Sequence, residues 1–221
     1  VDRITAGTGL NILVGGGAAD QILASSTGAG SMIFGDGAEI TFTGDIGQIH
    51  AARSIAQSGG AGEEITLGMS GAIVFGGEGA DTITATGGDN RIFGDFGQAV
   101  VVNNQLEGLT SLAGVNGGDD TITTAGGDDI VLGGHGADRI VTSGGSNILI
   151  GDHASIDGLV AASAAGLALP VEGGALGLHS ILTAAAEGGD DRIDGGAARD
   201  LIIGGQGGDA LLGGAGDDDI I

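Results

Sequence analysis

Glycine, aspartate and an aliphatic residue recur along this chain in a fixed order, with a period of nine residues. The fullest copies occupy residues 15–22, 76–83, 133–140 and 204–211. Self-similarity at a fixed period is typical of a stacked repeat, because each unit can bury its apolar side chains only against its neighbours. A carboxylate in every copy indicates that the stack holds metal ions.

Charge limits the partners that the chain can have. Its 221 residues include 29 acidic and 6 basic side chains, which give a formal net charge of −23. Such repulsion opposes compaction unless cations neutralise it, and it excludes nucleic acid and anionic membrane surfaces as partners. Divalent cations are the partners that this charge favours.

The hydrophobic residues argue for a folded chain. They make up 41% of the sequence and fall at fixed intervals, unlike those of a disordered polymer. The 51 glycines lack the three-residue period of collagen. No apolar run is long enough to cross a bilayer, so we expect no membrane insertion.

The absence of cysteine suits a cytosolic protein, and it also suits a secreted protein that is stapled by metal instead of disulfides. The residues from Val1 onward do not have the pattern expected of a signal peptide. Because Val1 and Ile221 both fall inside repeats, we expect residues 1–221 to be a single calcium-binding segment of a longer repetitive protein.

A longer period lies above the short one. It divides the chain into units 2–62, 63–119, 120–190 and a truncated 191–221. In each full unit a Gly-Asp signature is followed by a less glycine-rich excursion, over 41–62, 99–119 and 155–189. The excursions predict either one wider turn without metal, or a surface loop or short helix, with 161–165 and 182–186 as the helical candidates.

The last residues of each nonapeptide predict a short strand with one inward side chain, and the six before them predict a glycine-rich turn. Two nonapeptides then form a coil of about 18 residues, and successive coils stack as parallel strands about 4.8 Å apart. We expect Ile22, Ile83, Ile140 and Leu211 to point inward from one sheet, and Leu13, Ile73, Ile130 and Leu201 from the other. So thin a core does not offset the entropy lost on ordering, and calcium, which takes 6–8 oxygen ligands, is the stabiliser that carboxylates and free carbonyls favour.

The pattern Gly-Gly-x-Gly-x-Asp-x-aliphatic-x resembles that of the RTX (repeats-in-toxin, haemolysin-type) calcium-binding family. The resemblance implies an all-β fold, a right-handed parallel β-roll or β-solenoid that folds on calcium after type I secretion. It also implies two rows of metal ligands. One row consists of Asp2, Asp20, Glu63, Asp81, Asp120, Asp138, Asp191 and Asp209. The opposite row consists of Asn11, Asn90, Asp129, Asn147, Asp200 and Asp218.

Several positions depart from the family pattern. Ser31 and Ala72 offer no carboxylate, three Asn replace Asp, and Ala18 replaces a turn glycine. We expect the sites at these positions to be weak or empty, and the sites in 117–138 and 188–221 to fill at lower calcium. The Gly-Asp signatures add Asp36, Asp95 and Asp152 as metal ligands that cap the last ion on their edge.

These features predict a structural calcium-binding module of a large secreted or cell-surface protein of adhesin, matrix or surface-layer type. Its open ends invite self-association into a fibre or surface array. The alternative is a non-catalytic carrier region of a secreted protease, lipase or epimerase.

The sequence contains no catalytic motif, so we do not expect an enzyme. Asp152, His153 and Ser155 are close in sequence without the roles of a triad, and four scattered histidines do not make a zinc site. A carbohydrate-binding module is disfavoured because Trp and Tyr are absent. Ice binding is disfavoured because the threonines at 82, 84, 121 and 123 give way to Arg139 and Val141.

Overall fold

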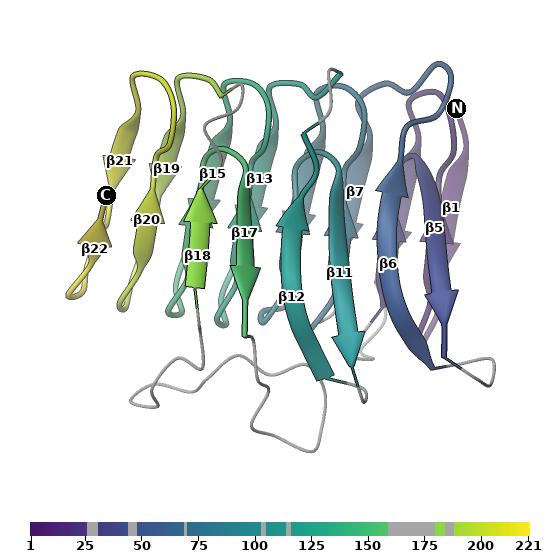
Figure 1. The fold of residues 1–221 in the computed structure, drawn as a ribbon, viewed down its shortest axis with the longest axis horizontal. Coiled ribbons are helices and arrows are strands. Elements are labelled where there is room, and N and C mark those ends of the chain that lie inside the picture. Colours follow the sequence, from purple (N-terminus) through teal and green to yellow (C-terminus); the bar gives the residue numbers. More distant parts are fainter. Residues whose placement is uncertain are drawn as a thin grey trace.

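The computed structural model of the chain is a stack of three β-sheets (Figure 1). It describes residues 1–25, 31–43, 48–68, 70–102, 105–113, 116–158, 180–183 and 188–221. Every regular element within these ranges is a strand, and none of them contains a helix that could span a membrane. The predicted all-β parallel roll is therefore confirmed.

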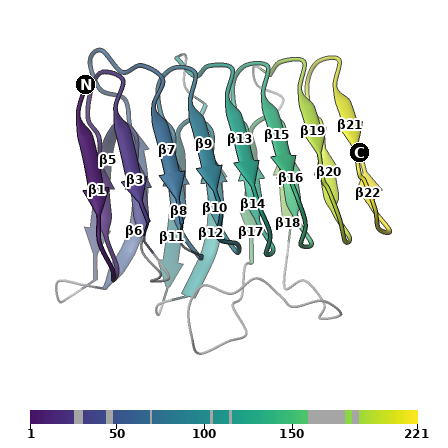
Figure 2. The same cartoon turned by 180° about the vertical axis from the view of Figure 1, so that it is seen from behind.

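Two eight-stranded parallel sheets form the roll (Figure 2). The outer sheet has the order β1 (Arg3–Ala6), β3 (Gln21–Ala24), β7 (Glu64–Leu67), β9 (Thr82–Ala85), β13 (Thr121–Thr124), β15 (Arg139–Thr142), β19 (Arg192–Asp194), β21 (Ala210–Leu212). The middle sheet has the order β2 (Ile12–Val14), β4 (Met32–Phe34), β8 (Ile73–Phe75), β10 (Arg91–Phe93), β14 (Ile130–Leu132), β16 (Ile148–Ile150), β20 (Leu201–Ile203), β22 (Asp219–Ile220). Along the chain, each outer strand is followed by a middle strand, and these two strands together form one coil of the roll.

The space between these two sheets is filled by a column of aliphatic side chains. Ile22, Ile83 and Ile140 are fully buried there, and Leu211 packs against the same cluster. Outer strands such as β9 alternate between buried and exposed residues, because one face of this sheet meets solvent. The inward positions predicted for the outer sheet are confirmed.

For the middle sheet the predicted inward set is partly wrong. Leu13 does pack in the inner core, but Ile73, Ile130 and Leu201 lie on the opposite face. The residue that points inward is the central one of each three-residue strand, as Val74 in β8 shows. Strands such as β8 and β14 are buried on both faces and apolar throughout, so they show no alternation from which to choose the face.

A third sheet, the cover sheet, packs on the second face of the middle sheet (Figure 1). It is antiparallel, in the order β18 (Ser180–Thr183), β17 (Ala154–Asp157), β12 (Gln105–Ser111), β11 (Gly97–Val102), β6 (Ile49–Ile55), β5 (Gly37–Phe42). Each excursion therefore contributes two antiparallel strands to the cover sheet, and for these strands the predictions of a wide turn, a loop or a helix are wrong. Of the second helical candidate, Leu182 and Thr183 lie in β18; residues 161–165 and 184–186 lie outside the described residues.

Two repeated contacts hold the cover sheet in place. Ser54 Oγ accepts a hydrogen bond from the Gly97 N–H (2.9 Å), and Ser111 Oγ accepts one from the Ala154 N–H (2.8 Å), so each hairpin is joined to the next. Beneath them, Phe34, Phe75 and Phe93 stack with ring centroids 4.9 and 4.8 Å apart. This spacing equals that of neighbouring strands.

Candidate metal centre

The turns of the roll form two edges. The upper edge, uppermost in Figures 1 and 2, contains the turns that lead from the middle to the outer sheet. The lower edge contains the turns that lead back. On the upper edge, continuous turns alternate with turns that a hairpin interrupts. The continuous ones are 15–20, 76–81, 133–138 and 204–209, and the interrupted ones begin at 35, 94 and 151 and end at 63, 120 and 191.

Carboxylates form a ladder along the upper edge, one to each coil. Along the column, except at Glu63, whose side chain accepts none, the backbone N–H of one acidic residue donates to the side chain of the next: Asp81 to Asp120 (2.7 Å), Asp120 to Asp138 and Asp138 to Asp191 (both 2.8 Å). The same bond joins Asp2 to Asp20, Glu63 to Asp81 and Asp191 to Asp209. The structure thus brings all eight residues of the first predicted row into one column.

Where a carboxylate accepts a ladder bond, the bond uses only one of its two oxygens. The second oxygen is buried without a hydrogen-bond partner in Asp20, Asp81, Asp120, Asp138 and Asp191, and both oxygens of Glu63 are in this state. A buried acceptor without a partner is costly. A cation or a proton bound to these oxygens would remove that cost.

Each unpartnered oxygen faces a carbonyl of the next coil. A β-carbon placed on Gly76 would collide with the carbonyl oxygen of Gly94 and with Asp81 Oδ2. The same holds for Gly133, whose β-carbon would meet the Gly151 carbonyl and Asp138 Oδ2. Glycine is required here because two oxygens of different coils converge on its α-carbon. The Gly94 and Gly151 carbonyls each accept one backbone N–H, from Gly77 and Gly134, and their second lone pair forms, with the unpartnered carboxylate oxygen, a cradle for a cation.

Burial makes these carboxyls hard to ionise when they are without metal. It raises the pKa of Asp81 and of Asp138 to about 8 and that of Asp191 to about 7, with nearby carboxylates adding to the effect. Burial followed by the Asp81 charge raises the pKa of Glu63 to about 10. The column therefore needs positive charge to stay both buried and ionised at neutral pH.

The donor set fits calcium. The described residues contain no group of three or more His, Cys, Asp and Glu side chains that could hold a metal by themselves, so backbone carbonyls have to supply most of the ligands. A site of one or two carboxylates and several carbonyls consists of oxygen alone, which is the environment of a hard cation with tolerant geometry.

The Gly-Asp residues lie where each hairpin leaves the upper edge. Asp95 Oδ1 accepts from the Gly118 N–H (3.2 Å), at the return of the hairpin, and its Oδ2 accepts from the His135 N–H in the next coil. Asp152 makes the equivalent bonds with Gly189 and Gln206, and Asp36 accepts from the Glu78 N–H. These side chains therefore close the interrupted turns, and their contact with a metal stays a prediction.

The lower edge carries a second, mixed column. It consists of Asn11, Ser31, Ala72, Asn90, Asp129, Asn147, Asp200 and Asp218, in that order along the roll. The ladder bonds recur, for example from the Asn90 N–H to Asp129 Oδ1 (2.8 Å) and from the Asn147 N–H to Asp200 Oδ1 (2.8 Å). Asp129 and Asp200 each keep one unpartnered buried oxygen, and burial raises the pKa of both to about 6.

A further set of carboxylates was not predicted. Asp119, Asp128 and Asp190 precede column residues and accept hydrogen bonds from the N–H groups of Ala137 (2.9 Å), Ser146 (2.8 Å) and Gly208 (2.7 Å), one coil further on. The sequence feature that could have predicted these residues is the Asp-Asp doublet, which occurs at 119–120, 128–129 and 190–191. The first Asp of each doublet ties neighbouring turns together.

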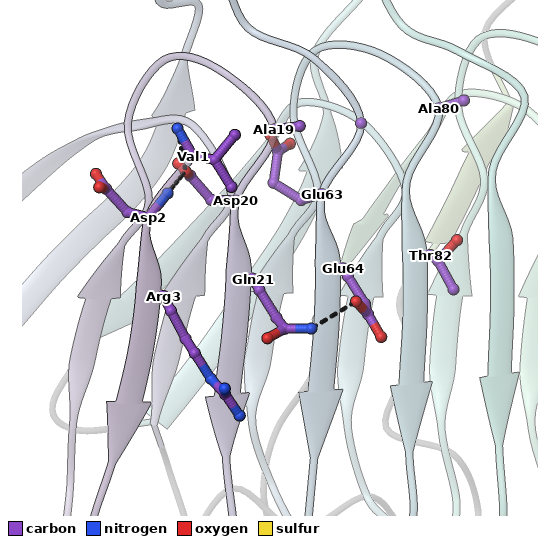
Figure 3. A pocket seen from close by; sticks show the side chains of 11 residues that line it. Val1, Asp2, Arg3, Ala19, Asp20, Gln21, Glu63, Glu64, Ala80 and Thr82 are labelled. Atoms are coloured by element: carbon purple, nitrogen blue, oxygen red, sulfur yellow. Dashed lines mark hydrogen bonds and ion pairs between the residues drawn. The ribbon is translucent and has the colours of Figure 1, made fainter.

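The upper column reaches solvent at the end of the roll that holds Val1. A pocket of about 670 Å³ opens there, lined by Asp2, Asp20 and Glu63 among others (Figure 3). On the adjoining face of the outer sheet, Gln21 Nε2 donates to Glu64 Oε2 (2.7 Å). Asp2, the first residue of the column, is thus exposed to solvent, while Asp20 and Glu63 behind it are buried.

Comparison with known proteins gives one match. The family model of the RTX calcium-binding nonapeptide repeat matches four segments of the chain, at residues 1–26, 67–100, 115–149 and 186–220. Together they cover more than half of the chain and contain all four continuous upper-edge turns. Neither the curated proteins nor the solved structures contain a match to the chain.

Proposed function

The chain belongs to the family of RTX calcium-binding nonapeptide repeats, and it binds several calcium ions; we propose that it is a structural module of a large secreted or cell-surface protein that folds on extracellular calcium. The observation that carries the proposal is the column of buried carboxylate oxygens on the upper edge, each without a hydrogen-bond donor and each facing a carbonyl of the next coil.

We assign the ions to the cradles between successive coils. On the upper edge the carboxylate ligands are Asp20, Asp81, Asp138 and Asp209 in the continuous turns, and Asp2, Glu63, Asp120 and Asp191 in the others. On the lower edge they are Asp129, Asp200 and Asp218. Bound calcium supplies the positive charge that these oxygens lack, while the ladder of N–H groups orients the carboxylates.

This chemistry couples folding to location. A site that does not exist in the unfolded chain makes the free energy of metal binding a part of the free energy of folding. Extracellular calcium modules bind at about 10⁻⁴–10⁻³ M, so they fill outside the cell and stay empty where calcium is scarce. We therefore place the module outside the cell, in a protein of adhesin, matrix or surface-layer type reached by type I secretion.

A carrier region in a secreted enzyme would use the same folding chemistry. The two roles differ in the domains that adjoin the module, so a catalytic domain in the same polypeptide would favour the carrier role. Self-association is a further part of the proposal: β1, β2, β21 and β22 each lie at the edge of a sheet and can pair with another copy. Light scattering with and without calcium tests it.

The experiment that tests the main proposal is circular dichroism of the chain, first in chelator and then during calcium titration, with magnesium as the control ion. We expect the β signal to appear with calcium and to be weaker with magnesium, which demands octahedral geometry and keeps its waters. The double variant Asp138→Ala and Asp209→Ala should need more calcium for the same signal. A fully ordered chain in chelator would contradict the proposal.

A further inference from the structure

Both edges of the roll have the same kind of hydrogen bond between successive coils, but the side chains that accept these bonds differ between the edges. Every residue of the upper column is acidic, whereas the lower column alternates between amide and acid over Asn90, Asp129, Asn147 and Asp200. Both asparagines are almost completely buried, at 0% and 2% exposure. Their amide groups therefore have to find all their partners inside the protein.

Asn147 finds partners for both ends of its amide. Its Oδ1 accepts the ladder bond from the Asp129 N–H (3.0 Å). Its Nδ2 donates to the Gly145 carbonyl (3.0 Å) in its own turn and to Asp200 Oδ1 (2.9 Å) in the next coil, and Thr142 Oγ1 lies 3.1 Å away. An amide turned the other way would place its NH₂ against the Asp129 N–H, so the ladder determines its orientation.

Asn90 repeats this arrangement. Its Oδ1 accepts from the Ala72 N–H (3.1 Å), and its Nδ2 donates to the Gly87 carbonyl (2.6 Å) and to Asp129 Oδ1 (3.3 Å). Asn11, at the start of the column, likewise donates to the carbonyls of Gly9 (2.8 Å) and Gly7 (3.2 Å). Three turns of one edge thus use a side-chain NH₂ group to hold their carbonyls.

The NH₂ group links the same kinds of partner that a cation links on the other edge. Upper-edge cradles contain a turn carbonyl of the next coil and a carboxylate oxygen that accepts no hydrogen bond. In the turns of Asn90 and Asn147, the side-chain NH₂ donates to a turn carbonyl and to the Oδ1 of the next coil's aspartate, the oxygen that also accepts the ladder bond. The Oδ2 of that aspartate stays unpartnered and belongs to the aspartate's own turn. A calcium ion and an N–H donor cannot face the same carbonyl lone pair, so the amide excludes the ion.

A buried guanidinium supports the same interpretation. Arg91 follows Asn90 in β10 and is 2% exposed. Its Nη1 donates to the Asp89 carbonyl, and the carboxylates whose charges act on it are those of Asp89, Asp128 and Asp129. The protein therefore supplies a cation of its own to the acidic residues of this turn.

We propose that the side-chain amides of Asn90 and Asn147 take the place of calcium in their turns, so that these coils close without metal and the calcium ions gather mainly on the upper edge. This inference rests on the proposed calcium-dependent folding. The residue that ends a turn therefore determines how the turn is closed. A turn that ends in Asp is closed by a calcium ion, and a turn that ends in Asn is closed by hydrogen bonds of the amide.

The test counts calcium ions in the full chain by native mass spectrometry and by equilibrium dialysis at millimolar calcium. Asn147→Asp should bind more calcium than the wild type, because it replaces a donor by an acceptor in an otherwise complete cradle. It should also need more calcium than the wild type to reach the same β signal in circular dichroism. Gln98→Glu, which adds one negative charge on β11 in the cover sheet, is the matched control and should leave the ion count unchanged.

The reverse substitution, from Asp to Asn on the upper edge, keeps the test informative if Asn147→Asp does not fold. Asp138→Asn should bind fewer calcium ions than the wild type and need less calcium to remain folded. An unchanged ion count in both Asn147→Asp and Asp138→Asn would overturn the inference while leaving the proposed function intact. A wild-type chain that binds no calcium would instead overturn the proposed function.

Discussion

At the first position of each upper-edge turn, a glycine faces the carboxylate that ends the same turn. Gly76 and Asp81 are one such pair, and the Gly94 carbonyl of the next coil completes the cradle. The repeat therefore needs glycine for close approach at this position and for backbone freedom at the next, where Gly77 has a φ of 119°. Ala18, with a φ of 84°, adopts the same left-handed region at a steric cost.

Gly76→Ala should destabilise the calcium-bound protein by about 1–3 kcal/mol, because the added methyl group overlaps a backbone carbonyl that cannot move freely. Gly126→Ala is the control: its β-carbon would meet no atom within 4 Å, and the change should stay within about 0.5 kcal/mol. Chemical denaturation at saturating calcium measures both. Equal effects of the two substitutions would show that the cradle is not tightly packed.

At the scale of the element, the difference between the sheets follows from what covers them. Outer strands alternate, because solvent meets one face, whereas Ile73, Val74 and Phe75 of β8 are all fully buried. The cover sheet makes this possible by adding a second hydrophobic core to the thin one inside the roll. Calcium is therefore not the sole stabiliser of the chain, since the hairpins bury apolar surface that the coils alone would expose.

Phe75→Ala should test that second core. Phe75 is the middle ring of the stack between Phe34 and Phe93, so its truncation leaves a cavity and should cost about 3–5 kcal/mol. Phe42→Ala, at the 45% exposed end of β5, should change stability by less than about 0.5 kcal/mol. Thermal melts at saturating calcium would reveal the difference, and similar melting temperatures would show that the cover sheet adds little.

At the scale of the whole molecule, 8 of the 29 acidic residues lie in the upper column. The upper column is acidic throughout, and the hairpins leave the roll from the same edge (Figure 1). Metal binding there both neutralises the column and clamps the turns that bracket each hairpin. The order of filling should follow ligand quality, with 117–138 and 188–221 occupied before the coils around Ala72.

The pH dependence of the metal-free protein should follow from the raised carboxyl pKa values. Asp81 and Asp138 hold protons up to a pKa of about 8 when folded, against about 4 when unfolded. The folded state thus binds more protons between these values, so its stability falls as the pH rises from about 4 to about 8. Circular dichroism of the chain in chelator should show more β signal at pH 5.5 than at pH 8.5.

Calcium should reverse this trend, because it competes with protons for the same oxygens. Its apparent affinity should rise with pH over the same window, as measured by calcium titrations at pH 5.5, 7 and 8.5. A calcium affinity that does not change with pH would show that the carboxyls are already ionised in the folded, metal-free chain.

The nine-residue period was sufficient to predict the roll, its two edges, the column of acidic side chains and the inward isoleucines of the outer sheet, because each depends on residues close in sequence or one coil apart. The cover sheet could not be predicted in this way. Its hairpins pair with one another between residues far apart in sequence, such as Ser54 and Gly97, and their strands are stable only once the middle sheet lies beneath them. The packing of the cover sheet also determines which face of the middle sheet Ile73, Ile130 and Leu201 occupy. The sequence does not show this, because a strand that is apolar throughout can bury either face against the inner core. The buried partners of Asn90 and Asn147 likewise appeared only when neighbouring coils were stacked, because hydrogen bonds between coils depend on positions in space that a single repeat does not contain.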